Sequence, residues 1–177
     1  MAQRRPIKLP GVRAYLEEVK QVTAQEAATQ IVGRLIFLSP WYSGQFAQNW
    51  AVEVGDKRIP ATVDPLPGKR ERQPRGEVKL PTVPSLRGTG SKKVVGYTID
   101  NRTTYRRIAM DLEPGRTETA RQISAPRDWY VNFIQGGGLS DVLRASVGAA
   151  ASNPRVKGFR SKGTTQSFIG PQILINQ

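Results

Sequence analysis

The feature that most restricts the fold is an unbroken helical pattern that runs from Val12 to Leu38. Apolar side chains recur there at steps of three or four residues, which places them on one face of a helix. They are Leu16, Val19, Thr23, Ala27, Ile31, Leu35 and Leu38. Glu17, Glu18 and Lys20 supply the water-facing side. Pro40 ends the pattern, because the residue before a proline avoids helical dihedral angles.

Two short segments downstream alternate apolar and polar residues, as half-buried strands do. The first starts near Trp50, after a turn at Gly44, and ends at Gly55. The second spans residues 94–100. We expect these strands to pair antiparallel and the long helix to pack on them. The predicted fold class is therefore α+β, with a small and mainly antiparallel sheet.

The second half of the chain predicts two further helices and one ambiguous element. A short helix is expected from Thr103 or Thr104, its cap, to Pro114-Gly115. Residues 129–134, WYVNFI, fit both periodicities, and we favour a strand. A helix is then expected from Leu139 to Ser152, capped by Ser140. Its apolar face is predicted to consist of Leu139, Leu143, Val147 and Ala150.

An unusual segment, residues 56–93, separates the two strands. It holds six of the thirteen prolines, with ten basic and four acidic residues, and few large apolar side chains. Such a composition does not build a core element, so we predict an extended basic arm with a short hairpin near residues 79–83. The expected organisation is a basic N-terminal arm (1–11), a core (12–135) with this insertion, and a C-terminal helix and tail (136–177).

Composition narrows the chemistry. The chain has 27 Lys and Arg, 14 Asp and Glu, and neither cysteine nor histidine. Disulfides, thiolate or imidazole metal sites and nucleophile–histidine pairs are thereby excluded. The longest apolar run, residues 35–38, is far too short to span a bilayer, and we expect no secretory signal at the N-terminus. We expect no enzymatic activity, no cofactor and no metal. The net charge of +13 favours a polyanionic or acidic partner.

An ordered series of short motifs carries a family resemblance. Leu38-Ser39-Pro40 ends the helix, Ser43-Gly44-Gln45-Phe46 follows, and Asn49-Trp50 opens the strand; later come Asn101, Tyr105, Leu112-Glu113-Pro114-Gly115 and Ala125-Pro126. In this order the chain resembles the tail-completion and neck proteins of tailed bacteriophages, the group that includes the lambda-type minor tail protein Z. The resemblance covers about residues 14–135, with 56–93 as an insertion.

The resemblance implies a structural role for the protein. Such proteins are small α+β subunits that assemble as a homo-oligomeric ring, for example a hexamer, at the junction of tail and capsid. It implies a virion protein, assembled in the host cytoplasm, that contacts connector or stopper proteins and tail-tube or tail-terminator proteins. Genomic DNA in the channel is a further, non-specific contact. No membrane and no small-molecule substrate is implied.

The site residues that carry over are scaffold residues. Gly44 would permit the turn, Trp50 would sit in the core, and Asn101 and Tyr105 would fix the strand-to-helix corner, while Glu113 to Gly115 would end the helix. The motif set is completed by Pro40, Asn49 and Pro126. Trp41 and Tyr42 either cap the core or contact a neighbouring subunit. The arm's basic residues would face DNA or a neighbour: Lys69, Arg70, Arg72, Arg75, Lys79, Arg87, Lys92 and Lys93.

Two other classes stay open at this stage. A basic, non-sequence-specific nucleic-acid-binding protein, associated with the ribosome or with genome packaging, would also carry this charge. Residues 56–93 contain no aromatic ring on which a base could stack, so such binding would be to the phosphate backbone. A hydrolase that uses carboxylates is the third class, although the acids are few and scattered.

Overall fold

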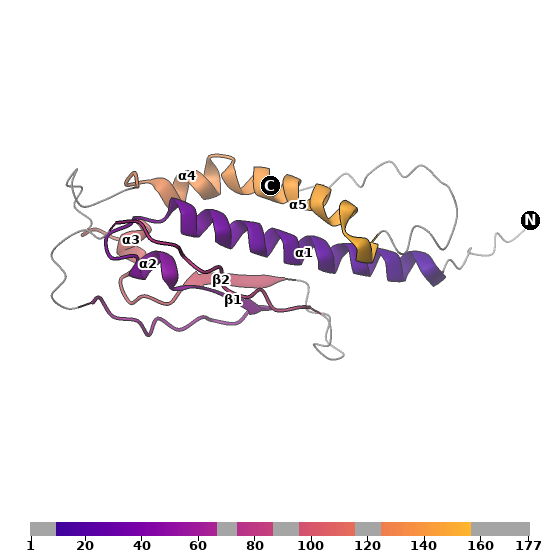
Figure 1. Ribbon diagram of the computed structural model, residues 1–177, viewed down its shortest axis with the longest axis horizontal. Helices are drawn as coiled ribbons and strands as arrows, with labels where there is room; N and C mark the ends of the chain where they lie inside the picture. The colour runs from indigo at the N-terminus through magenta and orange to yellow at the C-terminus, as the bar shows by residue number, and fades with distance from the viewer. Residues whose placement is uncertain (1–9, 67–73, 87–95, 116–124, 157–177) are drawn as a thin grey trace, which may run out of the picture.

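The computed structural model describes residues 10–66, 74–86, 96–115 and 125–156. The elements are α1 (Pro10–Leu38), α2 (Gln45–Gln48), β1 (Trp50–Val54), β2 (Tyr97–Asn101), α3 (Arg106–Ala109), α4 (Trp129–Gln135) and α5 (Gly138–Ser152). Figure 1 shows α1 as the middle layer, with α4 and α5 along one side and the sheet along the other. The fold is α+β, as the sequence predicts, with the long N-terminal helix at its centre.

The long helix α1 ends where the sequence places its end. The Ser39 amide donates the last helical hydrogen bond, to the Leu35 carbonyl, and Pro40 follows. The start lies at Pro10, so the last two residues of the expected 1–11 arm belong to the helix. Residues 1–9 of that arm lie outside the described residues.

The burial of α1 corrects the predicted single face. Because α1 is covered from two sides, its buried residues include Val22, Val32 and Ile36, which lie off the predicted stripe. Leu16, predicted to be in the core, is exposed. Glu18, predicted to face water, is buried and pairs with Arg155 beyond the end of α5.

The two strands pair antiparallel, which confirms the predicted sheet. Trp50 lies opposite Asn101 at one end of the ladder, and Val54 lies opposite Tyr97 at the other. Among the described residues the sheet has two strands. The inserted segment between them forms no hairpin at residues 79–83, where the structure shows no strand.

Two elements of the second half differ from prediction. Residues 129–134 form helix α4 and not a strand, because Trp129 and Phe133, one helical turn apart, are the two residues buried in the core. Helix α3 begins at Arg106, after Tyr105, and ends at Ala109. It stops early because Asp111 adopts a left-handed backbone (φ 60°) that a helix cannot continue through. Because the residue directly before the helix is Tyr105, neither Thr103 nor Thr104 caps its start.

Helix α5 belongs to the core and not to an extension. It runs antiparallel beside α1 (Figure 1), and its residue Ala150 packs with Val22 of α1. The buried face consists of Val142, Ser146 and Ala150, whereas the predicted face residues Leu143 and Val147 are exposed. The position before the helix is Gly137, with φ 98°, and Ser140 donates to its carbonyl without capping an amide. The predicted boundary at residue 136 is therefore not a boundary in packing.

Candidate functional site

The turn after α1 depends on Gly44. Its φ of 79° lies in the left-handed region, and a Cβ there would come within 2.7 Å of Cη2 of Trp41. Any side chain at this position would therefore meet both backbone strain and a buried indole ring. The predicted role of Gly44 in the turn is confirmed.

The aromatic residues around this turn form the core of the corner. Trp50 donates from Nε1 to the Ser39 hydroxyl at 2.9 Å. Phe46 packs edge-on against Trp50, with ring centroids 5.7 Å apart, and against Trp129 of α4 at 6.3 Å. Trp50 thus lies in the core between helix and sheet, as predicted.

Trp41 and Tyr42 were predicted either to cap the core or to contact a neighbouring subunit, and the structure shows where each side chain lies. The side chain of Trp41 is 3% exposed and packs into the core. Within the chain Trp41 therefore takes the first alternative, a cap on the core. Tyr42 is half-buried, so part of its ring stays at the surface.

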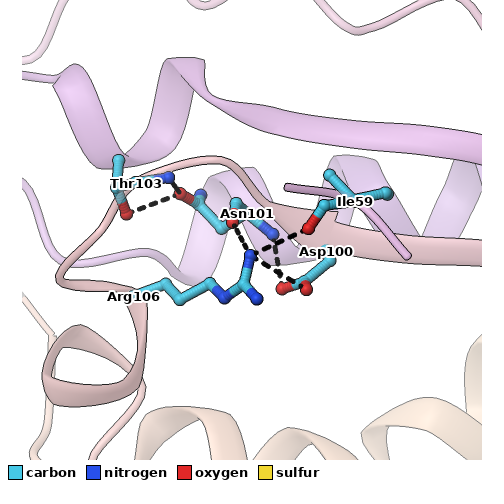
Figure 2. A network of polar contacts seen from close by, with 5 residues as sticks. All are labelled: Ile59, Asp100, Asn101, Thr103 and Arg106. Atoms are coloured by element: carbon cyan, nitrogen blue, oxygen red, sulfur yellow. Dashed lines mark hydrogen bonds and ion pairs between the residues drawn. The ribbon is translucent and has the colours of Figure 1, made fainter. Parts of the chain in front are cut away.

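The polar centre of the corner is Asn101, at the end of β2 (Figure 2). Its Nδ2 donates to the Phe46 carbonyl at 2.7 Å. Its Oδ1 accepts from the Thr103 amide at 3.0 Å and hydroxyl at 2.8 Å, as Figure 2 shows. Both residues are completely buried. Since the carboxamide of Asn101 is engaged on both sides within the chain, the network joins α2 to the loop after β2. Its predicted role at the corner is confirmed.

Arg106 extends this network to the chain after β1. Its Nη1 donates to the carbonyls of Asn101 at 2.9 Å and Ile59 at 3.2 Å, and lies 3.2 Å from Oδ2 of Asp100 (Figure 2). Ile59 is itself almost completely buried. Arg106 therefore holds the first part of the inserted segment against the sheet, and sequence reasoning did not single it out.

Tyr105 and Gln45 hold the continuation of that segment. The Tyr105 hydroxyl and the Leu66 amide both donate to Oε1 of Gln45, at 3.1 and 3.2 Å. Nε2 of Gln45 donates to the Asp64 carbonyl at 2.6 Å. Burial raises the pKa of Tyr105 to about 12. The corner role of Tyr105 is confirmed, and Gln45, part of the Ser-Gly-Gln-Phe motif, is the residue that sequence reasoning passed over.

The second described part of the insertion, residues 74–86, is here called the strap. At its start Trp41 donates from Nε1 to the Pro74 carbonyl at 3.2 Å. Arg75 donates from Nη2 to the carbonyls of Ile36 and Phe37, at 3.2 and 2.5 Å. Its guanidinium lies 5.3 Å from the ring centroid of Phe37 and 5.6 Å from that of Trp41. Arg75 thus satisfies the C-terminal carbonyls of α1 and stacks on two aromatic rings.

The rest of the strap follows α1 backwards and then reaches β2. Leu80 lies beside Gly33, where a Cβ would be 3.7 Å from its Cδ2. Val78 and Val83 pack against the core. The Tyr97 hydroxyl donates to the Pro84 carbonyl at 2.6 Å, and burial raises the pKa of Tyr97 although Arg155 acts in the opposite direction.

These contacts correct the picture of a projecting arm. Both described parts of residues 56–93 dock on the chain's own domain. Of the eight basic residues predicted to face DNA or a neighbour, Arg75 binds α1 and Lys79 is exposed. The other six lie outside the described residues: Lys69, Arg70, Arg72, Arg87, Lys92 and Lys93.

The remaining motif residues divide into two groups. Asn49 joins the corner, because its Nδ2 donates to the Gln45 carbonyl and its own carbonyl accepts from the Arg102 amide. Glu113 and Gly115 lie beyond the end of α3 and do not terminate it. Pro126 is exposed, and its carbonyl accepts from the amide of Trp129 at the start of α4.

Several large apolar side chains are exposed among the described residues. Phe37 on α1 is 64% exposed, and Leu80 on the strap that follows α1 is 49% exposed. On α5, Leu143 and Val147 are 43% and 41% exposed and lie one helical turn apart. Exposed apolar side chains grouped in this way are candidates for contact with another protein.

Comparison of the chain with protein-family models, with curated proteins and with solved structures finds no match. Over the described ranges no group of three acidic side chains could hold a metal ion. Nor does any helix there have the length and apolarity to cross a membrane. The arrangement of the described residues is that of a rigid corner with a docked strap.

Proposed function

We propose that this chain is a structural virion protein of a tailed bacteriophage. In this role it is a ring-forming subunit at the head–tail junction that completes the tail and helps to attach it to the capsid connector. The observation that carries the proposal is the convergence of the motif series. Gly44, Trp50, Asn101 and Tyr105, spread over some sixty residues of sequence, meet at one corner whose interactions are all structural.

Charge and surface support the same role. A net charge of +13 suits a subunit that borders a channel filled with DNA. Exposed apolar side chains lie on more than one element, with Phe37 on α1, Leu80 on the strap, and Leu143 and Val147 on α5. A subunit of a closed ring contacts a neighbour on either side and so needs surface for contact on more than one side.

The proposal is tested by the oligomeric state and the neighbourhood of the gene. Native mass spectrometry of the purified chain, alone and mixed with junction proteins encoded beside it, should show a closed ring of one copy number. Portal, capsid and tail-tube genes should flank the gene. A chain that stays monomeric under all these conditions, among unrelated genes, would refute the proposal.

Exposed basic residues favour one second candidate, a non-specific nucleic-acid-binding protein. Lys57, Arg58 and Arg102 are exposed around the sheet and the start of the insertion. This candidate predicts that the isolated chain binds duplex DNA and loses affinity steeply with salt, in proportion to the number of phosphates it contacts. Weak binding with a shallow salt dependence would exclude it in favour of the ring subunit.

A further inference from the structure

A surface that is both apolar and basic lies where the strap follows the last turns of α1. Phe37 of α1 is 64% exposed, and the Arg75 guanidinium lies 5.3 Å from the centroid of its ring. Gly33 and Phe37 are four residues apart, so they lie in one row along the helix. Leu80, which is 49% exposed, reaches this row, because a Cβ on Gly33 would be 3.7 Å from its Cδ2. The strap thus places Leu80 beside the row that leads to Phe37.

Arg75 is a cation that is held in place and still has donors to offer. Its Nη2 donates to the carbonyls of Ile36 and Phe37, and its guanidinium lies over the rings of Phe37 and Trp41. Within the described part of the chain, no acceptor binds its Nε or Nη1. A guanidinium that is already fixed loses little further freedom when it binds a carboxylate, so more of the interaction energy appears as affinity.

The charges around Phe37 suit an acidic partner. Arg34 is exposed and lies three residues before Phe37, which makes the two side chains neighbours on the surface of α1. After Glu26, α1 carries no acidic residue. In the strap the two basic residues outnumber Glu77, the one acidic residue. The charge balance of this surface is therefore positive, as it is for the whole chain.

The apolar side chains favour a protein over a nucleic acid as the occupant. A nucleobase binds by stacking on a free aromatic face, but the Arg75 guanidinium already lies over the ring of Phe37, and Leu80 offers no ring. Both side chains suit contact with another apolar side chain, because such contact removes apolar surface of both partners from water. A second copy of this chain is a poorer occupant, since it brings the same excess of positive charge.

We propose that the surface formed by Arg34, Phe37, Arg75 and Leu80 binds an acidic segment of a different protein. The segment places a carboxylate against the Arg75 guanidinium and an apolar side chain against Phe37 and Leu80. This inference rests on the proposed function in one respect, the existence of a partner protein at the junction. It adds which surface that partner uses and the chemistry by which the partner is recognised.

Fluorescence polarisation of labelled peptides with the full-length chain tests the proposal. The first peptide alternates aspartate with leucine and phenylalanine. The second has serine in place of the apolar residues, and the third has asparagine in place of aspartate. We expect the first peptide to bind about tenfold more tightly than either of the others, because only the first supplies both kinds of contact. Equal binding of the first peptide and either of the others would overturn the proposal.

Exposed positions supply variants and matched controls. Phe37→Ser should weaken binding of the first peptide about tenfold, and Arg34→Gln about threefold, because both side chains touch the ligand. Leu143→Ser and Arg144→Gln, at exposed positions of α5, should leave the affinity unchanged. Arg75 is kept in every variant, because it also holds the strap on α1. If the α5 variants weaken binding as much as the α1 variants do, the proposal is wrong.

Two further measurements distinguish the occupants and the two proposals. A short duplex DNA that displaces the first peptide and loses affinity on Phe37→Ser would make this a nucleic-acid site and overturn the proposal. Native mass spectrometry shows whether Phe37→Ser breaks a ring, and a broken ring would make the surface a contact between copies, which also overturns it. An intact ring without peptide binding refutes this inference alone, whereas a permanent monomer that binds the peptide refutes the proposed function alone.

Discussion

Asn101 is the residue on which the corner depends most, and its replacement by leucine gives a quantitative test. Leucine has the same number of side-chain heavy atoms as asparagine and branches at the same carbon, so Asn101→Leu leaves no cavity. It does remove the partner of the Thr103 amide and hydroxyl, and one of the two partners of the Phe46 carbonyl, which still accepts from the Asn49 amide. Asn101 and Thr103 are fully buried, so water cannot replace the lost bonds.

The expected magnitude follows from the two Thr103 groups left without a partner and from the Phe46 carbonyl, which loses one of its two. Each buried polar group that loses its hydrogen bond costs about 1–3 kcal/mol, and the costs do not simply add. We therefore expect Asn101→Leu to lower the free energy of unfolding by about 3–5 kcal/mol. A loss of this size is a large fraction of the stability of a small domain.

The assay is urea unfolding followed by circular dichroism, with the slope m compared between variants. The matched control is Asn132→Leu at an exposed position of α4, which should change the free energy of unfolding by no more than about 0.5 kcal/mol. A loss below about 1 kcal/mol for Asn101→Leu at unchanged m would refute the reasoning, because the buried amide would then not be holding the corner.

Four further changes test other parts of the structure. Gly44→Ala should lower the free energy of unfolding by about 1–3 kcal/mol, because φ at this position is 79° and the indole of Trp41 leaves no room for a Cβ. Gly148→Ala places a methyl group in open space within a helix, so it should raise the free energy of unfolding by up to about 1 kcal/mol. The pKa of Tyr105 is about 12 in the folded chain and about 10 in the unfolded chain. Its contribution to stability is therefore complete below pH 10 and is lost as the pH rises toward 12. Between these pH values the urea midpoint of Tyr105→Phe should fall less steeply than that of the unchanged protein. Glu18→Ala should cost about 1–3 kcal/mol, measured by urea unfolding, because it leaves Arg155 without its buried carboxylate, and a change within error would contradict that ion pair.

Local patterns predicted the elements whose partners are close in sequence. The end of α1 at Pro40 and the turn at Gly44 depend on dihedral preferences of single residues, which do not change with the surroundings. The strand character of β1 and of β2 followed from alternation within each segment, although their antiparallel pairing joins residues as distant in sequence as Trp50 and Asn101. Such features could be predicted because their physics is local.

The errors arose where a distant segment decides what is buried. Glu18 and Leu16 exchanged their expected environments because α5 and Arg155 cover one side of α1, which periodicity in α1 alone does not show. WYVNFI became helix α4 because Trp129 and Phe133 share one face against Phe46 and α5. Tertiary packing decided between two periodicities that the segment satisfies almost equally well.

The candidate site was predicted in part. The corner residues Gly44, Trp50, Asn101 and Tyr105 were identified from their motif order, although their contacts with one another could not be deduced. Arg106 and Gln45 were missed because each acts on backbone carbonyls or amides of the inserted segment. The composition of residues 56–93 predicted a free arm. In the structure Arg75 and the donors Trp41 and Tyr97 hold the second described part of this segment on the core.

The measurement that most directly tests the central claim is the location of this protein in a particle. Virions assembled with an epitope-tagged copy of the chain can be examined by electron microscopy with a gold-labelled antibody against the tag. The account predicts label at the junction between head and tail, and tails that fail to join heads when the gene is deleted. Purified virions without the protein, or normal joining in its absence, would contradict it.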